Sequence, residues 1–137
     1  MRDLNSESLT PIFKKYPDII AVYLFGSYIE DQEHAGDIDL AVLTLNAPLS
    51  PVNLYMELYP DLAELLGPLE VDLLFLQKAS LALAFEIISK GKVIYSSDDD
   101  LRTDYEYLIS GRYMDFKYHL DYGYKELYET VKEDLDV

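Results

Sequence analysis

Three acidic residues and one Gly-Ser pair are the positions of this sequence that could do chemistry together. Gly26-Ser27 is followed after nine residues by Asp37-Ile38-Asp39, and a further acid, Asp72, lies in a later apolar segment. Residues i and i+2 of a strand point to the same face, so Asp37 and Asp39 would lie about 6 to 7 Å apart along the chain. If the segment around Asp72 pairs alongside, the three carboxylates form one cluster.

A cluster of three carboxylates favours a bound cation. Without a cation the three groups repel one another, and at least one of them would have to hold a proton. Carboxylate oxygens that face an open polar site suit Mg²⁺, which is often carried in partly by the phosphates of a nucleotide. We therefore predict that Asp37, Asp39 and Asp72 are both the metal ligands and the catalytic residues of a magnesium site.

Gly26 and Ser27 are the expected phosphate-binding residues. Gly26 permits a tight turn and a close backbone approach, and Ser27 offers a hydroxyl and amide donors at the start of a short helix, where phosphate is favoured. In-line attack at an α-phosphorus, with one metal at the attacking hydroxyl and one at the leaving pyrophosphate, is the two-metal arrangement. In it, Asp37 and Asp39 would bridge the metals and Asp72 would bind the metal that activates the nucleophile.

Each of these signals is weak alone, because Gly-Ser is common and Asp-x-Asp arises easily in a chain with 26 acidic residues. Taken singly, they would be turn residues and solvated strand ends. Their order along the chain is what predicts nucleotidyl transfer: Gly-Ser after a buried strand, Asp-x-Asp at the start of the next, and an acid on a third.

The elements that would position these residues alternate along the chain. Apolar spacing and turn residues predict helices over 6–16, 52–66, 79–90 and 98–134, and strands over 19–25, 38–43, 69–76 and 92–95. We expect Pro60 to kink or split the second of these helices. The resulting fold class is α/β, with a small mixed sheet of about four strands flanked by helices and followed by a C-terminal helical segment.

The C-terminal segment is rich in tyrosine and has no proline. Gly111 and Gly123 weaken a helix, so we expect one long helix or two joined near one of these glycines. Tyrosine is enriched at protein interfaces, and the segment carries it on more than one side. Part of the segment should pack on the sheet and part should contact another protein chain. Its tyrosines are Tyr105, Tyr107, Tyr113, Tyr118, Tyr122, Tyr124 and Tyr128.

Composition limits the classes of protein that remain. A length of 137 residues with 50% hydrophobic residues suits one domain with a single core. The absence of cysteine excludes disulfides, thiolate metal sites and a cysteine nucleophile. No apolar run of about 18 residues and no signal peptide are visible, so we expect a cytoplasmic protein without a membrane partner.

The charge balance is strongly acidic, with 26 acidic and 11 basic residues and a net charge of −15. Such a field repels phosphate backbones, so direct binding to nucleic acid is disfavoured. The acidic residues form a solubilising surface, complement a basic protein partner, or do both.

The stretch from Val22 to Phe75 resembles the minimal nucleotidyltransferase domains of the DNA polymerase β-like superfamily. The segments Ile88–Tyr95 and Arg112–Asp115 resemble the MNT antitoxins, which are partners of HEPN ribonuclease toxins. The resemblance implies a polymerase β-like fold, with a core over 1–97 and an extension over 98–137 packed on the same domain. It further implies ATP as substrate, Mg²⁺ as cofactor, a cognate HEPN toxin as partner, and transfer of AMP to a toxin tyrosine.

The spacer after Gly-Ser departs from many relatives, because it lacks an arginine and carries Glu30 and Asp31. A non-enzymatic antitoxin that blocks the toxin by binding is therefore an alternative, and transfer to a small molecule such as an aminoglycoside is a third. Other residues are more weakly indicated and are interpreted first as surface groups. They are His34 as a phosphate contact, Glu70 as a supplementary ligand, and Lys90, Lys92 and Arg112 as phosphate ligands.

Overall fold

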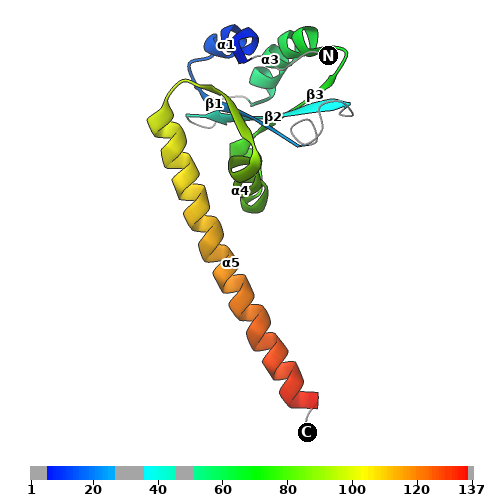
Figure 1. Cartoon of the computed structure of the whole chain (residues 1–137), viewed down its shortest axis with the longest axis vertical. Helices are drawn as coiled ribbons and strands as arrows, with labels where there is room; N and C mark the ends of the chain where they lie inside the picture. The colour runs from blue at the N-terminus through cyan, green and yellow to red at the C-terminus, as the bar shows by residue number, and fades with distance from the viewer. Residues whose placement is uncertain (1–5, 27–35, 46–50, 136–137) are drawn as a thin grey trace.

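The computed structural model describes residues 6–26, 36–45 and 51–135, and Figure 1 shows a small sheet domain from which one long helix projects. The short helix expected after Ser27 lies outside the described residues. The remaining predicted elements are all present, in the predicted order. They are α1 (Ser6–Lys14), β1 (Ile19–Phe25), β2 (Asp37–Thr44), α3 (Pro51–Leu66), β3 (Glu70–Phe75), a 3₁₀ turn η1 (Leu76–Lys78), α4 (Leu81–Lys90), β4 (Lys92–Ser96) and α5 (Asp99–Leu135).

The four strands form one mixed sheet in the order β3-β2-β1-β4. β1 pairs antiparallel with both β2 and β4, whereas β2 and β3 are parallel. A parallel pair needs a crossover, and α3 supplies it. The first six residues of β1 are buried, as expected for an apolar strand covered on both faces. The predicted mixed sheet of about four strands is therefore confirmed.

The sheet has a core on each face. On one face α1 and α3 pack on residues such as Val22, Leu40 and Phe75. On the other face α4 and the first part of α5 pack on Ala21, Tyr23, Ala41 and Leu43 (Figure 1). Because side chains alternate along a strand, the odd-numbered residues of β2 all face α4.

Of the kink or split expected at Pro60, the split is wrong, because α3 runs unbroken over Pro51–Leu66, and the kink stays a prediction. A proline inside a helix removes one backbone hydrogen bond. The flanking residues Leu58 and Leu62 are both fully buried in the core. Burial of two leucine side chains stabilises by several kcal/mol, about the same as the loss at the proline, and holds the helix together across it.

α4 begins two residues later than predicted, because Ser80 is its N-cap. The Leu83 backbone N–H donates to the Ser80 hydroxyl oxygen over 3.2 Å. At the other end, the Gly91 backbone N–H donates to the Ile87 carbonyl over 2.7 Å, and β4 follows at once. These two residues fix both ends of the helix that covers the second core.

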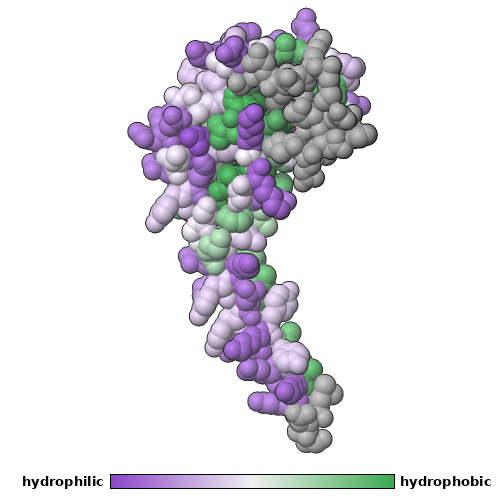
Figure 2. Space-filling view, in the orientation of Figure 1, coloured by the Kyte–Doolittle hydropathy of each residue, from purple (hydrophilic) through white to green (hydrophobic). Residues whose placement is uncertain are grey.

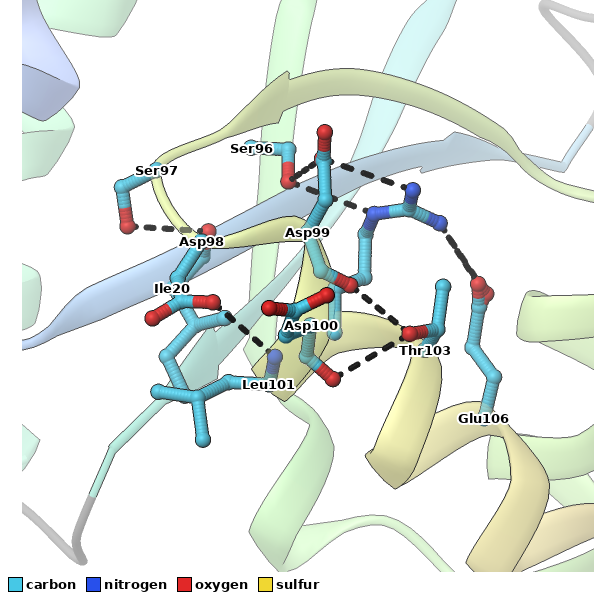
Figure 3. A network of polar contacts seen from close by, with 10 residues as sticks. Ile20, Ser96, Ser97, Asp98, Asp99, Asp100, Leu101, Thr103 and Glu106 are labelled. Carbon is cyan, nitrogen blue, oxygen red and sulfur yellow. Dashed lines mark hydrogen bonds and ion pairs between the residues drawn. The ribbon is translucent and has the colours of Figure 1, made fainter.

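The start of α5 is tied to β1 and β4 by polar contacts (Figure 3). The Ser97 hydroxyl donates to the Ile19 carbonyl over 2.8 Å, and its backbone N–H donates to the Ile20 carbonyl over 2.7 Å. Arg102 donates to the Ser96 hydroxyl oxygen over 3.2 Å and to a Glu106 carboxylate oxygen over 2.7 Å. The first turns of the helix are thus held against the sheet.

α5 is one helix of 37 residues, which settles the alternative of two helices joined at a glycine. Ile109 is its last buried side chain, and Tyr113 stacks on Phe85 of α4 with ring centroids 4.1 Å apart. Every described side chain from Met114 to Glu133 is exposed. Only the first part of the extension therefore packs on the domain, and the boundary between residues 97 and 98 stays a prediction. Nowhere in the described parts of the chain does a helix have the length and apolar character needed to cross a bilayer.

Candidate active site

The parallel pairing of β2 with β3 brings the three predicted acids together. Asp39 lies opposite Asp72 in the register, and Asp37 lies opposite Glu70. One carboxylate oxygen from each of Asp37, Asp39 and Asp72 can be chosen so that all three lie within 4.8 Å of one another. The expectation that the strand of Asp72 pairs alongside the Asp-x-Asp strand is confirmed.

The carboxylate cluster lies at one end of the sheet and is open to solvent. Asp37 and Asp39 are half-buried, and Asp72 is exposed. Asp39 shares its face of β2 with Ala41 and Leu43, which pack against α4 and α5. The cluster therefore faces the side of the sheet from which α5 projects.

Asp39 is the acid of the cluster whose negative charge its surroundings disfavour. Burial is the largest cause that raises the pKa of Asp39, followed by the charge of Asp37 and by the hydrogen bond and charge of Asp72; together they raise it to about 6. A hydrogen bond between two carboxyl groups needs a shared proton. A cation would replace that proton, and three closely spaced carboxylates fit the hard oxygen ligands of a divalent ion.

Gly26 has a steric role beside this cluster that sequence reasoning missed. Its φ is +81°, in the left-handed region, and a Cβ at this position would collide with the Asp39 carboxylate. Glycine thus leaves room for the carboxylate in addition to permitting the turn. Phe25 pairs with Asp39, so the turn at Gly26 lies beside the cluster. This neighbourhood is visible only once the strands are paired. The phosphate-binding role of Gly26 stays a prediction, and Ser27 lies outside the described residues.

The weaker candidates are not brought into the cluster. Glu70 is exposed, and Lys90 forms an exposed ion pair with Glu86 over 3.7 Å. Lys92 lies opposite Leu24, two residues before Gly26, so it is the basic residue of the sheet at the active-site end. Arg112 is an exposed residue of α5, and His34 lies outside the described residues.

A carboxylate triad on two neighbouring strands, beside a glycine turn on a small mixed sheet, is the arrangement of a nucleotidyltransferase. Residues 7–100 match the protein family described as "Polymerase beta, Nucleotidyltransferase". The chain therefore belongs to the polymerase β-type nucleotidyltransferase family, and the fold expected from the sequence is confirmed.

Individual relatives point to one branch of this family. The chain is 32% identical over 102 residues, 73% of this chain and 71% of the relative, to "Protein adenylyltransferase MntA" of Shewanella oneidensis. A crystal structure of a toxin-antitoxin with AMP-PNP matches 93% of this chain and 98% of its own, with a TM-score of 0.66 and 28% identity. A structure of a tri-AMPylated Shewanella oneidensis HEPN toxin in complex with MNT antitoxin matches 96% of this chain and 98% of its own, with a TM-score of 0.63 and 27% identity. The expected resemblance to MNT antitoxins is confirmed, as is the enzyme class, a nucleotidyltransferase of the protein adenylyltransferase type.

Proposed function

We propose that this chain is an antitoxin that transfers AMP from ATP to a tyrosine of a cognate HEPN toxin and thereby neutralises it. The observation that carries the proposal is the carboxylate cluster, whose oxygens lie within 4.8 Å of one another. Three acids gathered at one open end of a sheet serve no packing role, and they match the donor set of a divalent cation.

In this proposal Asp37 and Asp39 would hold two Mg²⁺ ions, and Asp72 would help to hold the one that activates the acceptor hydroxyl. Bound there, the ions would neutralise the triphosphate, lower the pKa of the acceptor hydroxyl and stabilise the leaving pyrophosphate. Gly26 and Ser27 would bind the β and γ phosphates through the backbone. Lys92 lies at the same end of the sheet but opposite Leu24, whose side chain belongs to the core under α1 and α3, so it is placed on the other face from the carboxylates.

At the α-phosphorus the reaction forms one bond and breaks one. The phenolic oxygen of the acceptor tyrosine bonds to the α-phosphorus of ATP, the bond from that phosphorus to the bridging oxygen of the β-phosphate breaks, and pyrophosphate leaves. The phenolic proton passes to water, which reaches the cluster because Asp72 is exposed. The open carboxylate edge thus admits an acceptor that belongs to another protein.

The relatives support the nucleotide and the partner. One solved toxin-antitoxin contains AMP-PNP, an analogue of ATP, and another contains a HEPN toxin that carries three AMP groups. The net charge of −15 would speed encounter with a basic partner. These observations make a protein acceptor a better supported substrate than an aminoglycoside.

Mass spectrometry of the partner tests the proposal. The purified chain is incubated with ATP, Mg²⁺ and the HEPN-domain protein encoded by the neighbouring open reading frame, and the intact mass of that protein is measured. We expect the mass to rise by whole AMP units, and peptide mapping to place them on tyrosine. Omission of Mg²⁺ or replacement of Asp37 and Asp39 by Asn should abolish the increase.

The same experiment decides between the enzymatic and the binding antitoxin. If the toxin is inhibited by the wild-type chain but gains no mass, the chain neutralises by binding alone. Inhibition by the double Asp→Asn variant at the same molar ratio as the wild type would also favour binding. Inhibition that depends on ATP and on the carboxylates supports transfer.

A further inference from the structure

The distal part of α5 carries an apolar stripe that nothing in the described chain covers. We define the distal stripe as Phe116, Leu120, Tyr124, Leu127 and Val131, which follow one another at spacings of three or four residues. Their exposed fractions are 51%, 42%, 64%, 60% and 47%. At about 1.5 Å per residue the stripe extends roughly 22 Å beyond the domain. Figure 2 shows apolar surface recurring along one margin of the projecting helix.

The distal stripe continues the face by which α5 packs on its own domain. Tyr105, Ile109 and Tyr113 contact α4 or the second core, and Phe116 follows Tyr113 at the next helical position of the same face. At roughly 100° per residue, all eight positions fall within one side of the helix. The first turns of this side are covered by α4, and the following turns have the same character without a cover. A helix with an apolar side of this kind packs against another helix.

We infer that the distal stripe is the docking surface for the HEPN toxin, which packs a helix against it in continuation of α4; this inference rests on the proposed function. The solved toxin-antitoxin relatives match 93% to 96% of this chain, which leaves too few unmatched residues to omit the projecting helix. The helix is therefore a shared part of chains whose structures contain a toxin.

Charge argues against a second copy of this chain as the occupant. Each copy carries −15, so two copies packed along their helices would bring together two strongly acidic chains. A partner of lower negative charge, or a basic one, avoids that repulsion. The toxin is the partner that the proposed function requires, and it is present in the solved toxin-antitoxin structures whose chains share this helix.

The docking surface lies on the functional side of the molecule. The carboxylate cluster faces the same side of the sheet as α4, and α5 projects from that side (Figure 1). A toxin held against the distal stripe is thus on the side where the acceptor tyrosine must enter. Docking on the helix would supply affinity, while the carboxylate edge needs to bind only the acceptor segment.

Two matched triple variants test the inference. The stripe variant is Phe116→Gln, Leu120→Gln and Leu127→Gln, and the control is Met114→Gln, Tyr118→Gln and Tyr122→Gln. The control residues lie on the other side of the helix and are similarly exposed, at 54%, 68% and 55%. All six positions are solvent-exposed and glutamine favours helix, so both variants should keep the helical circular dichroism signal of the wild type.

Calorimetric titration with the HEPN-domain protein of the neighbouring reading frame measures the dissociation constant. We expect at least a hundredfold weaker binding for the stripe variant and less than threefold for the control. In the transfer assay, the stripe variant should need more toxin to reach half-maximal rate but reach the same rate at saturation. Equal affinity of both variants and the wild type would overturn the inference while leaving the proposed function intact. Binding that depends on the stripe but leads to no AMP transfer would support the docking surface and overturn the proposed function.

Sedimentation of the chain alone completes the test. A wild-type monomer is expected. A dimer that dissociates in the stripe variant and persists in the control would show that a second copy covers the stripe, and would overturn docking of the toxin there.

Discussion

The substitution Asp39→Asn should make the metal-free protein more stable while removing its response to metal. The carboxyl group of Asp39 lies between Asp37 and Asp72, and its pKa is raised from the usual 3.8 to about 6. A pKa raised on folding means that ionisation of this group opposes folding. The asparagine side chain keeps the shape of the aspartate but carries no charge. The substitution therefore removes the unfavourable charge from the folded state.

The size of the effect follows from the shift. A shift of about two pH units corresponds to at most about 3 kcal/mol, and solvent screening of this partly exposed group reduces the expected gain to about 1 kcal/mol. The direction in which stability changes with pH also follows from the raised pKa. The contribution of Asp39 to stability is fully present below pH 3.8, is lost as pH rises through about 6, and is absent at pH 8. The advantage of Asp39→Asn should therefore grow between pH 4 and pH 6 and level off above.

Urea unfolding in EDTA, followed by circular dichroism at several pH values, measures the difference. Asp115→Asn is the matched control, because Asp115 is an exposed residue of α5 remote from the cluster. Addition of Mg²⁺ should then stabilise the wild type and leave Asp39→Asn nearly unchanged; a concentration of 100 times the dissociation constant gives about 2.7 kcal/mol. A metal-free Asp39→Asn protein that is less stable than wild type at pH 8, or a difference that does not change with pH, would refute the reasoning.

Three further substitutions test the glycine turn at the site, the core beneath α4 and α5, and the N-cap of α4. Gly26→Ala forces a Cβ into the Asp39 carboxylate at a φ of +81°; it should destabilise by about 1 to 3 kcal/mol and weaken stabilisation by Mg²⁺, both measurable by thermal unfolding with and without the ion. Tyr23→Phe removes a buried hydroxyl that lies near the Arg102 guanidinium but has no partner at full hydrogen-bond geometry among the described residues; urea unfolding should show a gain of about 1 kcal/mol, and a loss would show that the contact with Arg102 is a stabilising hydrogen bond. Ser80→Ala removes the N-cap of α4 and should lower the free energy of unfolding by about 1 kcal/mol, whereas Ser80→Asp should restore it.

The sequence predicted the strands well because each has a strong local signal. The strand over 19–25 agrees with β1 residue for residue, since its seven apolar residues lie between a proline turn and a glycine. The turn η1 was not predicted, because Leu76–Lys78 has the pattern of a strand end followed by a loop. The split expected at Pro60 was wrong, because local propensity says nothing about the core packing of the leucines around it.

The candidate site was predictable as a set of residues but not as a geometry. Acids spaced by two on a strand indicate a shared face, but only the parallel register places Asp72 opposite Asp39. The collision between a side chain at position 26 and Asp39 depends on two strands that are distant in sequence. Likewise, the apolar spacing of α5 has the same pattern before and after Tyr113, so the sequence could not tell where the domain ends and the exposed helix begins.

β1 sets the distance between the anchor of α5 and the carboxylate cluster. Ser97, which precedes α5, binds the carbonyl groups of Ile19 and Ile20 at one end of this strand, and Gly26 follows the other end. Seven residues of extended chain span about 23 Å, and no linker separates them from the helix anchor. The distance from the anchor of α5 to the turn beside the carboxylates is therefore set by one strand, so the acceptor segment of a partner docked on α5 would have to span that distance itself.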